Sequence, residues 1–210
     1  RFEKSYFEGE AASSILGQSA DSPKSTIFES MKTDVQKELP IGIQDFPSLI
    51  KGNYLYVDKT DYYHRLITKG KYYFLSRPRR FGKSLLITTL KAIFEGRREL
   101  FEELWIHDRF DWVPRPVIHL DFSEIVSRET PLAVSLDMEM DRIAAEHGLD
   151  PLDGDYSHKF RQIIEKVAKE RQVAILVDEY DKPIINYIDN LEALDQNRQI
   201  LKNLYSVIKG

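Results

Sequence analysis

A Gly-Lys-Ser triplet at residues 82–84 constrains the fold of this chain more than any other feature, because of what flanks it. The apolar run Tyr-Tyr-Phe-Leu before it predicts a buried strand over residues 71–76. After it, Leu86, Leu90 and Ile93 recur at helical spacing and predict an amphipathic helix packed on a sheet. A strand, a loop and a helix that begins at Gly-Lys-Ser form the layout of a phosphate-binding loop. In such a loop, backbone N–H groups and a helix N-terminus face anionic oxygens.

The loop is strongly basic and departs from the general phosphate-loop pattern at one position. The first glycine of G-x-x-x-x-G-K-[ST] falls at Arg77. Arg79, Arg80 and Lys83 bring further positive charge into the same turn, which is unfavourable unless an anion or an acidic partner offsets it. That crowding argues against the alternative of a plain solvated loop. Lys83 would supply a point charge to a phosphate, and the Ser84 hydroxyl could ligate Mg²⁺.

A second motif lies further along the chain. Residues 173–177 are continuously apolar and predict a strand buried on both faces, as parallel strands in α/β proteins are. Asp178 and Glu179 follow directly, in the layout of a Walker B motif. The first acid could hold a Mg²⁺ shell, and the second could orient and deprotonate a water. Either motif alone is weak, but together they favour a nucleotide site, since ligands bind at the C-terminal edge of open α/β sheets.

The order of the expected elements predicts the fold class. Strands alternate with helices over residues 71–210, which favours an α/β fold with a doubly wound, mostly parallel sheet. Another strand is expected at residues 117–122, and helices at residues 60–69 and 191–209. The first 30 residues are rich in Ser, Gly, Ala and Glu and lack a sustained period. We therefore expect residues 1–36 to be a flexible or extraneous extension of a domain over residues 37–210.

Composition narrows the class of protein. The 210 residues carry a formal net charge of −4, so the chain has no global basic footprint for nucleic acid. It has no cysteine, which excludes disulfides and thiolate metal sites, and its five histidines lack ligand spacing. No apolar run approaches the roughly 18 residues of a membrane span. Without a signal-peptide pattern either, we expect a cytoplasmic protein with no membrane partner.

Several phrases resemble the prokaryotic AAA-ATPase-like family over residues 37–210. The family loop itself reads RPRRFGKS, so Arg77 departs from the general pattern but not from this family. The resemblance implies a P-loop NTPase core of the additional-strand type that binds ATP with Mg²⁺. Members often carry a C-terminal PD-(D/E)XK nuclease-like domain. The phrases are LPIG at residues 39–42, YVDKT at 56–60, FLSRPRRFGKS at 74–84 and VDEYDKP at 177–183.

Carried over by position, the resemblance assigns roles to the motif residues. Lys83 would contact the β- and γ-phosphates, and Ser84 would ligate Mg²⁺. Asp178 would hold the metal shell, and Glu179 would be the catalytic base. Other loop residues complete the expected nucleotide-binding set, with Arg77 and Arg80 as our own assignments for extra phosphate contacts: Arg77, Arg79, Arg80, Phe81, Gly82 and Leu85.

The additional-strand fold needs one more strand, which follows the Walker B strand in sequence and lies between it and the phosphate-loop strand. That strand and the nuclease-like domain would come after Gly210. We therefore expect this chain to be the N-terminal part of a longer protein and to hydrolyse ATP poorly by itself.

The leading hypothesis is a Mg·ATP-binding, ATP-hydrolysing module that drives or regulates an attached effector, such as a nuclease. The alternatives are a nucleotide-dependent switch without productive turnover and a module whose arginines bind the nucleic-acid backbone. Expected partners are ATP, the C-terminal remainder and, through the effector, nucleic acid, with a homo-oligomer as an open option. Asp58, Asp121 and Asp181 are secondary candidates, for which helix caps or a solvated strand end are competing interpretations.

Overall fold

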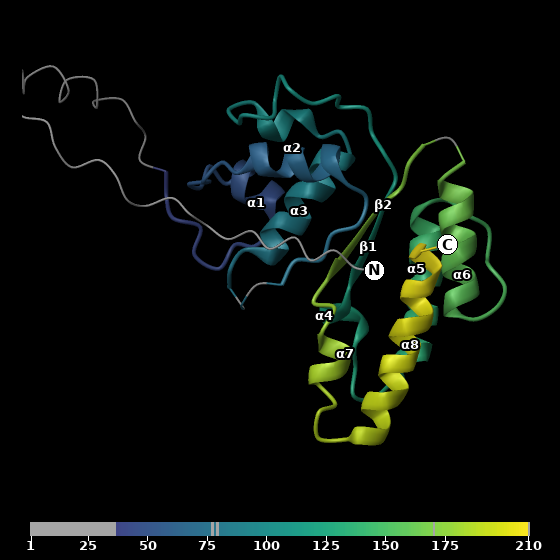
Figure 1. Ribbon diagram of the computed structural model, residues 1–210. Coiled ribbons are helices and arrows are strands. Elements are labelled where there is room, and N and C mark those ends of the chain that lie inside the picture. Colours follow the sequence, from purple (N-terminus) through teal and green to yellow (C-terminus); the bar gives the residue numbers. More distant parts are fainter. Residues whose placement is uncertain (1–36, 77, 79, 170, 210) are drawn as a thin grey trace, which may run out of the picture. The chain divides into compact units, whose positions relative to one another are not determined.

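The computed structural model describes residues 37–76, 78, 80–169 and 171–209 (Figure 1). The predicted extension over residues 1–36 lies outside the described residues. The described part is an α/β structure, as predicted, and its elements in chain order are α1 (Phe46–Lys51), α2 (Thr60–Lys69), α3 (Lys83–Phe94), the 3₁₀ helix η1 (Arg98–Phe101), β1 (Val117–Asp121), α4 (Phe122–Ile125), α5 (Leu132–Glu146), α6 (Tyr156–Val167), β2 (Ala174–Asp178), α7 (Lys182–Ile185) and α8 (Leu191–Lys209).

Two parallel strands form the sheet of the described residues. Strands β1 and β2 pair in register, from Val117 beside Ala174 to Asp121 beside Asp178. The connection between them contains α5 and α6, since parallel strands need a long crossover. Both strands lie within one residue of their predicted positions. A doubly wound sheet of more strands is not formed by the described residues, whose sheet ends at these two.

Helices cover the strands in two groups. The larger apolar cluster joins α5, α6 and α8 to Ile118 and Leu120, which point from β1 to the same side. A second cluster gathers around Ile93 of α3 and Phe101 of η1. Helix α3 also packs against both strands, so it connects the second cluster to the sheet. Figure 1 shows the same division, with α5, α6 and α8 together and α1, α2 and α3 together.

The helix predictions hold best where an apolar stripe is long. Helices α2 and α8 have the predicted bounds. Helix α5 begins at Leu132, with Pro131 as its N-cap residue. Helix α6 is capped by Asp155. The Asp155 carboxylate accepts the backbone N–H groups of Ser157 and His158 at 3.1 and 2.9 Å, and a charged acceptor suits the positive end of a helix.

Helix α1 lies in a segment that the sequence patterns predict as loop and short strand. Its local signal is an N-cap: the Asp45 carboxylate accepts the Ser48 N–H at 2.9 Å, with Pro47 in the first turn. Phe46 and Leu49 are buried, so tertiary packing supports a helix too short to show a period.

The predicted strand over residues 71–76 is wrong for this structure. The segment is extended but pairs with no other strand among the described residues. Tyr72 is 70% exposed and Phe74 is 73% exposed, although their sequence is typical of a buried strand. The physical reason is that strand propensity reflects packing and ladder pairing with neighbours, and no neighbouring strand is present here.

Candidate nucleotide site

The backbone before α3 is left-handed at two positions, Arg80 and Gly82. Gly82 is the N-cap residue, with a left-handed φ of 71°, and Arg80 is also left-handed, with a φ of 65°. Left-handed residues within a turn point successive N–H groups into one concavity, which binds anions. The first-turn N–H groups of α3 add donors that have no acceptor within the helix.

Glycine at position 82 is explained by conformation rather than by space. A Cβ atom built there would meet nothing within 4 Å, so no neighbour excludes a side chain. Residues with a Cβ disfavour the left-handed region, whereas glycine adopts it readily.

The first turn of α3 carries the predicted phosphate and metal ligands. Lys83 and Ser84 are half-buried there. The Leu85 side chain packs into the second apolar cluster, so its contribution to a site would come from its backbone N–H. Phe81 is 62% exposed beside them. Arg77 and Arg79 lie outside the described residues.

Hydrogen bonds fix α3 close to its N-terminus. The Thr88 hydroxyl accepts the backbone N–H of Phe46 at 3.0 Å, which ties α3 to α1. The buried Thr89 hydroxyl donates to the Leu85 carbonyl at 2.6 Å. These bonds and the cluster beneath them hold the helix that presents the loop.

The acid pair (Asp178 and Glu179) stands at the C-terminal end of β2. Asp178 is the last strand residue, is 7% exposed, and its Oδ1 accepts the Glu179 N–H at 2.9 Å. Glu179 has a left-handed φ of 50°, an uncommon conformation for a residue with a long side chain. Non-glycine residues in this region are concentrated at functional sites, where surrounding structure holds them.

Asp121 lies next to Asp178 across the sheet, because the parallel register pairs these two residues. Its Oδ1 accepts the Ser123 N–H at 2.7 Å and so caps α4. The structure thereby gives Asp121 the capping role and also places it beside the acid pair.

The two motifs are linked by packing. Helix α3 packs against β2 directly. In addition, the Phe74 ring contacts the Tyr180 ring, with centroids 4.9 Å apart and planes at 58°. Phe74 lies in the segment that leads into the phosphate loop, and Tyr180 follows the acid pair. The sequence patterns did not predict this contact. The feature of the sequence that could have indicated it is an aromatic residue near each motif.

The oxygen donors of these motifs suit Mg²⁺. A hard cation takes carboxylate and hydroxyl ligands, and Mg²⁺ keeps several waters and binds substrate phosphates rather than a full protein cage. Asp178 and Ser84 supply a carboxylate and a hydroxyl of that kind. Within the described ranges, no three His, Asp or Glu side chains are grouped to hold a metal by themselves.

Asp58 has a structural role, whereas the Asp181 side chain makes no capping hydrogen bond at the start of α7. The Asp58 carboxylate accepts the N–H and hydroxyl of Thr60 at 2.8 and 2.7 Å, and the Trp105 N–H at 2.6 Å. These bonds join the start of α2 to the segment after η1, so Asp58 acts as a capping residue. Asp181 is the N-cap residue of α7.

A polar cavity of about 260 Å³ lies along β1, lined in part by Lys91, His119, Asp121 and Glu124. The His119 Nε2 is buried and has no hydrogen-bond partner among the described residues. Burial and the charge of Lys91 lower the pKa of His119, so its imidazole is neutral at pH 7.

A family profile described as "Predicted AAA-ATPase" matches residues 40–210, which include both motifs and every element of the fold. The chain belongs to this family. Membership in the Predicted AAA-ATPase family indicates nucleotide binding and ATP use, and it confirms the resemblance seen in the sequence.

One curated relative is the "Uncharacterized protein in vnfD 5'region" of Azotobacter chroococcum mcd 1. It is 42% identical over 179 residues, which are 83% of this chain and 35% of the relative. The chain therefore spans about a third of the length of that curated relative. No solved structure matches the chain.

No helix in the described part of this family member is both long enough and apolar enough to cross a bilayer.

Proposed function

We propose that the chain binds Mg·ATP between the phosphate loop (residues 77–84) and the acid pair, and that the whole protein hydrolyses it. The observation that carries the proposal is the start of α3, where left-handed Gly82 precedes Lys83 and Ser84 in the first turn. Support also comes from the packing of α3 on β2, whose last residue is Asp178.

In this proposal, the residues of the two motifs have different roles in phosphoryl transfer. Lys83 contacts the β- and γ-phosphate oxygens, and Arg77, Arg79 and Arg80 are expected to add positive charge around them. Ser84 and Asp178 would hold Mg²⁺, the latter through its water shell, and the ion would supply positive charge to offset the charge on the phosphate oxygens.

Glu179 serves as the base in this proposal. It accepts a proton from the attacking water, whose oxygen forms a bond to the γ-phosphorus. The bond from that phosphorus to the β–γ bridging oxygen then breaks, and ADP and phosphate are the products.

The domain over residues 37–210 is, in this proposal, the N-terminal part of a longer protein. The greater length of the curated relative supports this idea, and so do the exposed rings of residues 72–74, since the described residues form a sheet of two strands. The module would drive or regulate an attached effector, and a nuclease acting on nucleic acid is our choice of effector.

Calorimetry with Mg·ATP tests the proposed site. The wild-type chain should bind saturably, and Lys83→Ala should weaken binding by about tenfold or more, because a charge-assisted hydrogen bond to phosphate is lost. Lys91→Ala, near the other end of α3, is the matched control and should bind as wild type does. Equal affinity in the wild type and Lys83→Ala would refute the site.

Two further measurements separate the alternatives. Glu179→Gln should keep ATP binding in a longer protein but abolish turnover, whereas a switch would bind ATP and show no turnover even as wild type. If the arginines bind the nucleic-acid backbone instead, binding of a DNA probe should fall steeply with salt and persist in saturating ATP.

A further inference from the structure

The contact between the Phe74 and Tyr180 rings joins the segment before the phosphate loop to the segment after the acid pair. Neither residue belongs to the phosphate loop or to the acid pair. Phe74 is otherwise mostly exposed, so its ring has few other partners to set its position. Tyr180, in contrast, is half-buried and follows a strand end that is held in place.

The turn that carries Tyr180 is fixed on both sides. Before it, the Glu179 N–H donates to Asp178, the last residue of β2. Across it, the Lys182 N–H donates to the Glu179 carbonyl at 2.9 Å. The left-handed backbone of Glu179 turns the chain between these bonds. These bonds tie the backbone of Tyr180 to the acid pair, and the contact with Phe74 is made by the ring that this backbone carries.

Tyr180 is half-buried, and its ring lies against the Phe74 ring. Tyr205 of α8 lies close by, and burial, aided by Tyr180, raises the pKa of Tyr205 to about 12. The Tyr72 hydroxyl donates to the Ile208 carbonyl of α8 at 3.3 Å, which tethers the same segment as Phe74.

We propose that Tyr180 is a positioning residue: by holding Phe74, it fixes the position of the phosphate loop relative to the acid pair. This inference rests on the proposed function of the site. Phosphate oxygens bound at the loop and a Mg²⁺ shell held at Asp178 must meet on one ATP molecule. The ring contact links the segment before the phosphate loop to the segment after the acid pair, which are far apart in the sequence.

The expected signature is a loss of Mg²⁺ dependence rather than a general loss of ATP binding. Binding of ATP without Mg²⁺ depends on the phosphate loop alone. The gain in affinity on adding Mg²⁺ depends on the phosphate loop and the acid pair being correctly placed relative to each other. An aromatic pair contributes enough to change that gain by roughly threefold to tenfold. Calorimetric titrations of ATP with Mg²⁺ and with EDTA would measure the gain in each variant.

Four variants and one control make the test specific. Tyr180→Ala and Phe74→Ala should each reduce the Mg²⁺-dependent gain, and the double variant should be no worse than either, because both remove the same contact. Tyr180→Phe should restore the wild-type gain, since the ring alone makes the contact. Phe74→Ala removes an exposed side chain, so it keeps the test valid if Tyr180→Ala unfolds. Tyr73→Ala, an exposed aromatic in the same segment, is the matched control and should leave the gain unchanged.

The outcomes distinguish this inference from the proposed function. If the wild type binds Mg·ATP and both alanine variants keep the full gain, the positioning role is wrong while the site stands. If the variants lose affinity equally with and without Mg²⁺, Tyr180 has a structural role only, and the inference is overturned. If the wild type itself does not bind ATP, both the proposed function and the inference are wrong.

Discussion

At the scale of single residues, left-handed backbone marks both halves of the candidate site. Gly82 adopts it at no steric cost, whereas Glu179 and Arg80 adopt it with full side chains. A left-handed conformation costs about 1–2 kcal/mol in a residue that has a Cβ. The structure around Glu179 therefore holds it against a local preference, and the Asp178 carboxylate bonded to its N–H is part of that restraint.

Gly82 can be compared with a second glycine that has the same backbone. Gly148 has a φ of 65°, and a Cβ there would also meet nothing within 4 Å. We expect Gly82→Ala and Gly148→Ala each to lower the free energy of unfolding by about 1 kcal/mol, for the same conformational reason. Denaturant unfolding of both variants would measure it.

Ligand binding should separate the two glycine variants. Gly82→Ala should weaken Mg·ATP binding, because it strains the backbone that presents the loop N–H groups, and Gly148→Ala should not. Equal ATP affinity in the two variants would contradict the proposed role of Gly82.

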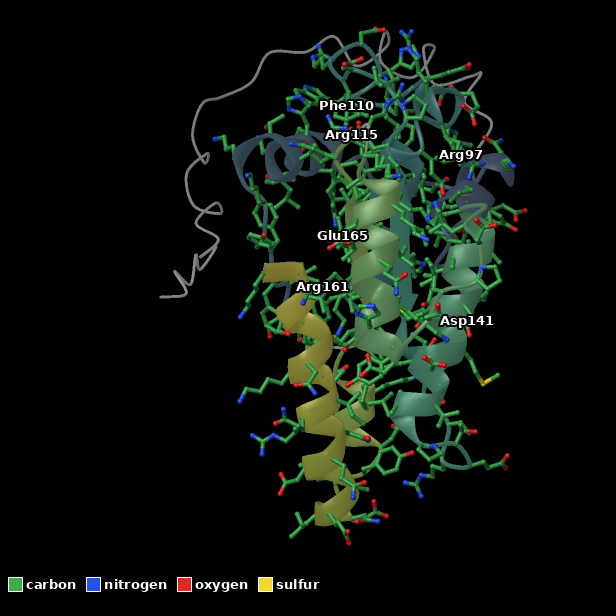
Figure 2. The ribbon with its side chains drawn as sticks, turned by 90° about the vertical axis from the view of Figure 1, so that its right-hand side faces the viewer. Arg97, Phe110, Arg115, Asp141, Arg161 and Glu165 are labelled. Atoms are coloured by element: carbon green, nitrogen blue, oxygen red, sulfur yellow. The ribbon has the colours of Figure 1, made fainter. Side chains whose placement is uncertain are left out.

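At the scale of elements, one buried cation joins α5 to α6. The Lys159 ammonium donates to Asp137 and Asp141 of α5, each at 2.9 Å, and its side chain is 8% exposed. Asp141 is labelled on α5 in Figure 2, where α5 and α6 both carry charged side chains on their outer faces. Removing one partner of a buried pair leaves the other charge without compensation.

Lys159→Met should therefore destabilise the fold by about 2 kcal/mol, less than the roughly 3–5 kcal/mol of fully buried pairs, because the two aspartates are partly exposed. Lys166→Met, on the exposed side of the same helix, is the control and should have little effect. Chemical denaturation at pH 7 would measure both, and equal stabilities would show that the ion pair contributes nothing net.

The same variant has a defined pH dependence. Hydrogen bonds to Asp141 and then Asp137 raise the pKa of Lys159 above its usual value, despite its burial. A raised lysine pKa means that the stabilisation is fully present below about pH 10 and is lost as pH rises through the folded-state pKa. The difference between the wild type and Lys159→Met should accordingly stay constant from pH 7 to about pH 9 and shrink above pH 10.

Whole elements were predictable to different degrees. The bounds of α2 and α8 follow from their apolar stripes, and β2 follows from a continuous apolar run that ends in acids. The start of α3 follows from its Gly-Lys-Ser sequence. Residues 71–76 have an equally clear strand pattern, yet they form no strand, because a ladder needs a partner that the local sequence cannot supply.

At the scale of the whole molecule, the two parallel strands that the described residues form are few for a sheet of this type. Parallel sheets are usually covered on both faces and built from more strands. Residues 72–74 have exposed rings and the composition of a core strand. We expect a longer protein of this family to supply the strand that pairs β2 with this segment.

Hydrogen exchange would test that expectation. Amides of residues 72–75 should exchange within seconds in the present chain and at least tenfold more slowly in a longer protein, because ladder hydrogen bonds protect amides from exchange. Amides of α8 serve as the control, since they are already bonded within a long helix. Equally fast exchange of residues 72–75 in the longer protein would contradict the completed sheet.

The sequence by itself determined the features that depend on near neighbours along the chain. These are the phosphate loop before α3, the acid pair after an apolar strand, and the stripes of the long helices, since capping, periodicity and left-handed glycine are local physics. Only the tertiary structure decided the contacts between distant segments. The register of β1 and β2 set Asp121 beside Asp178, and packing brought Phe74 to Tyr180. Such contacts depend on how the whole core closes, which no short stretch of residues encodes.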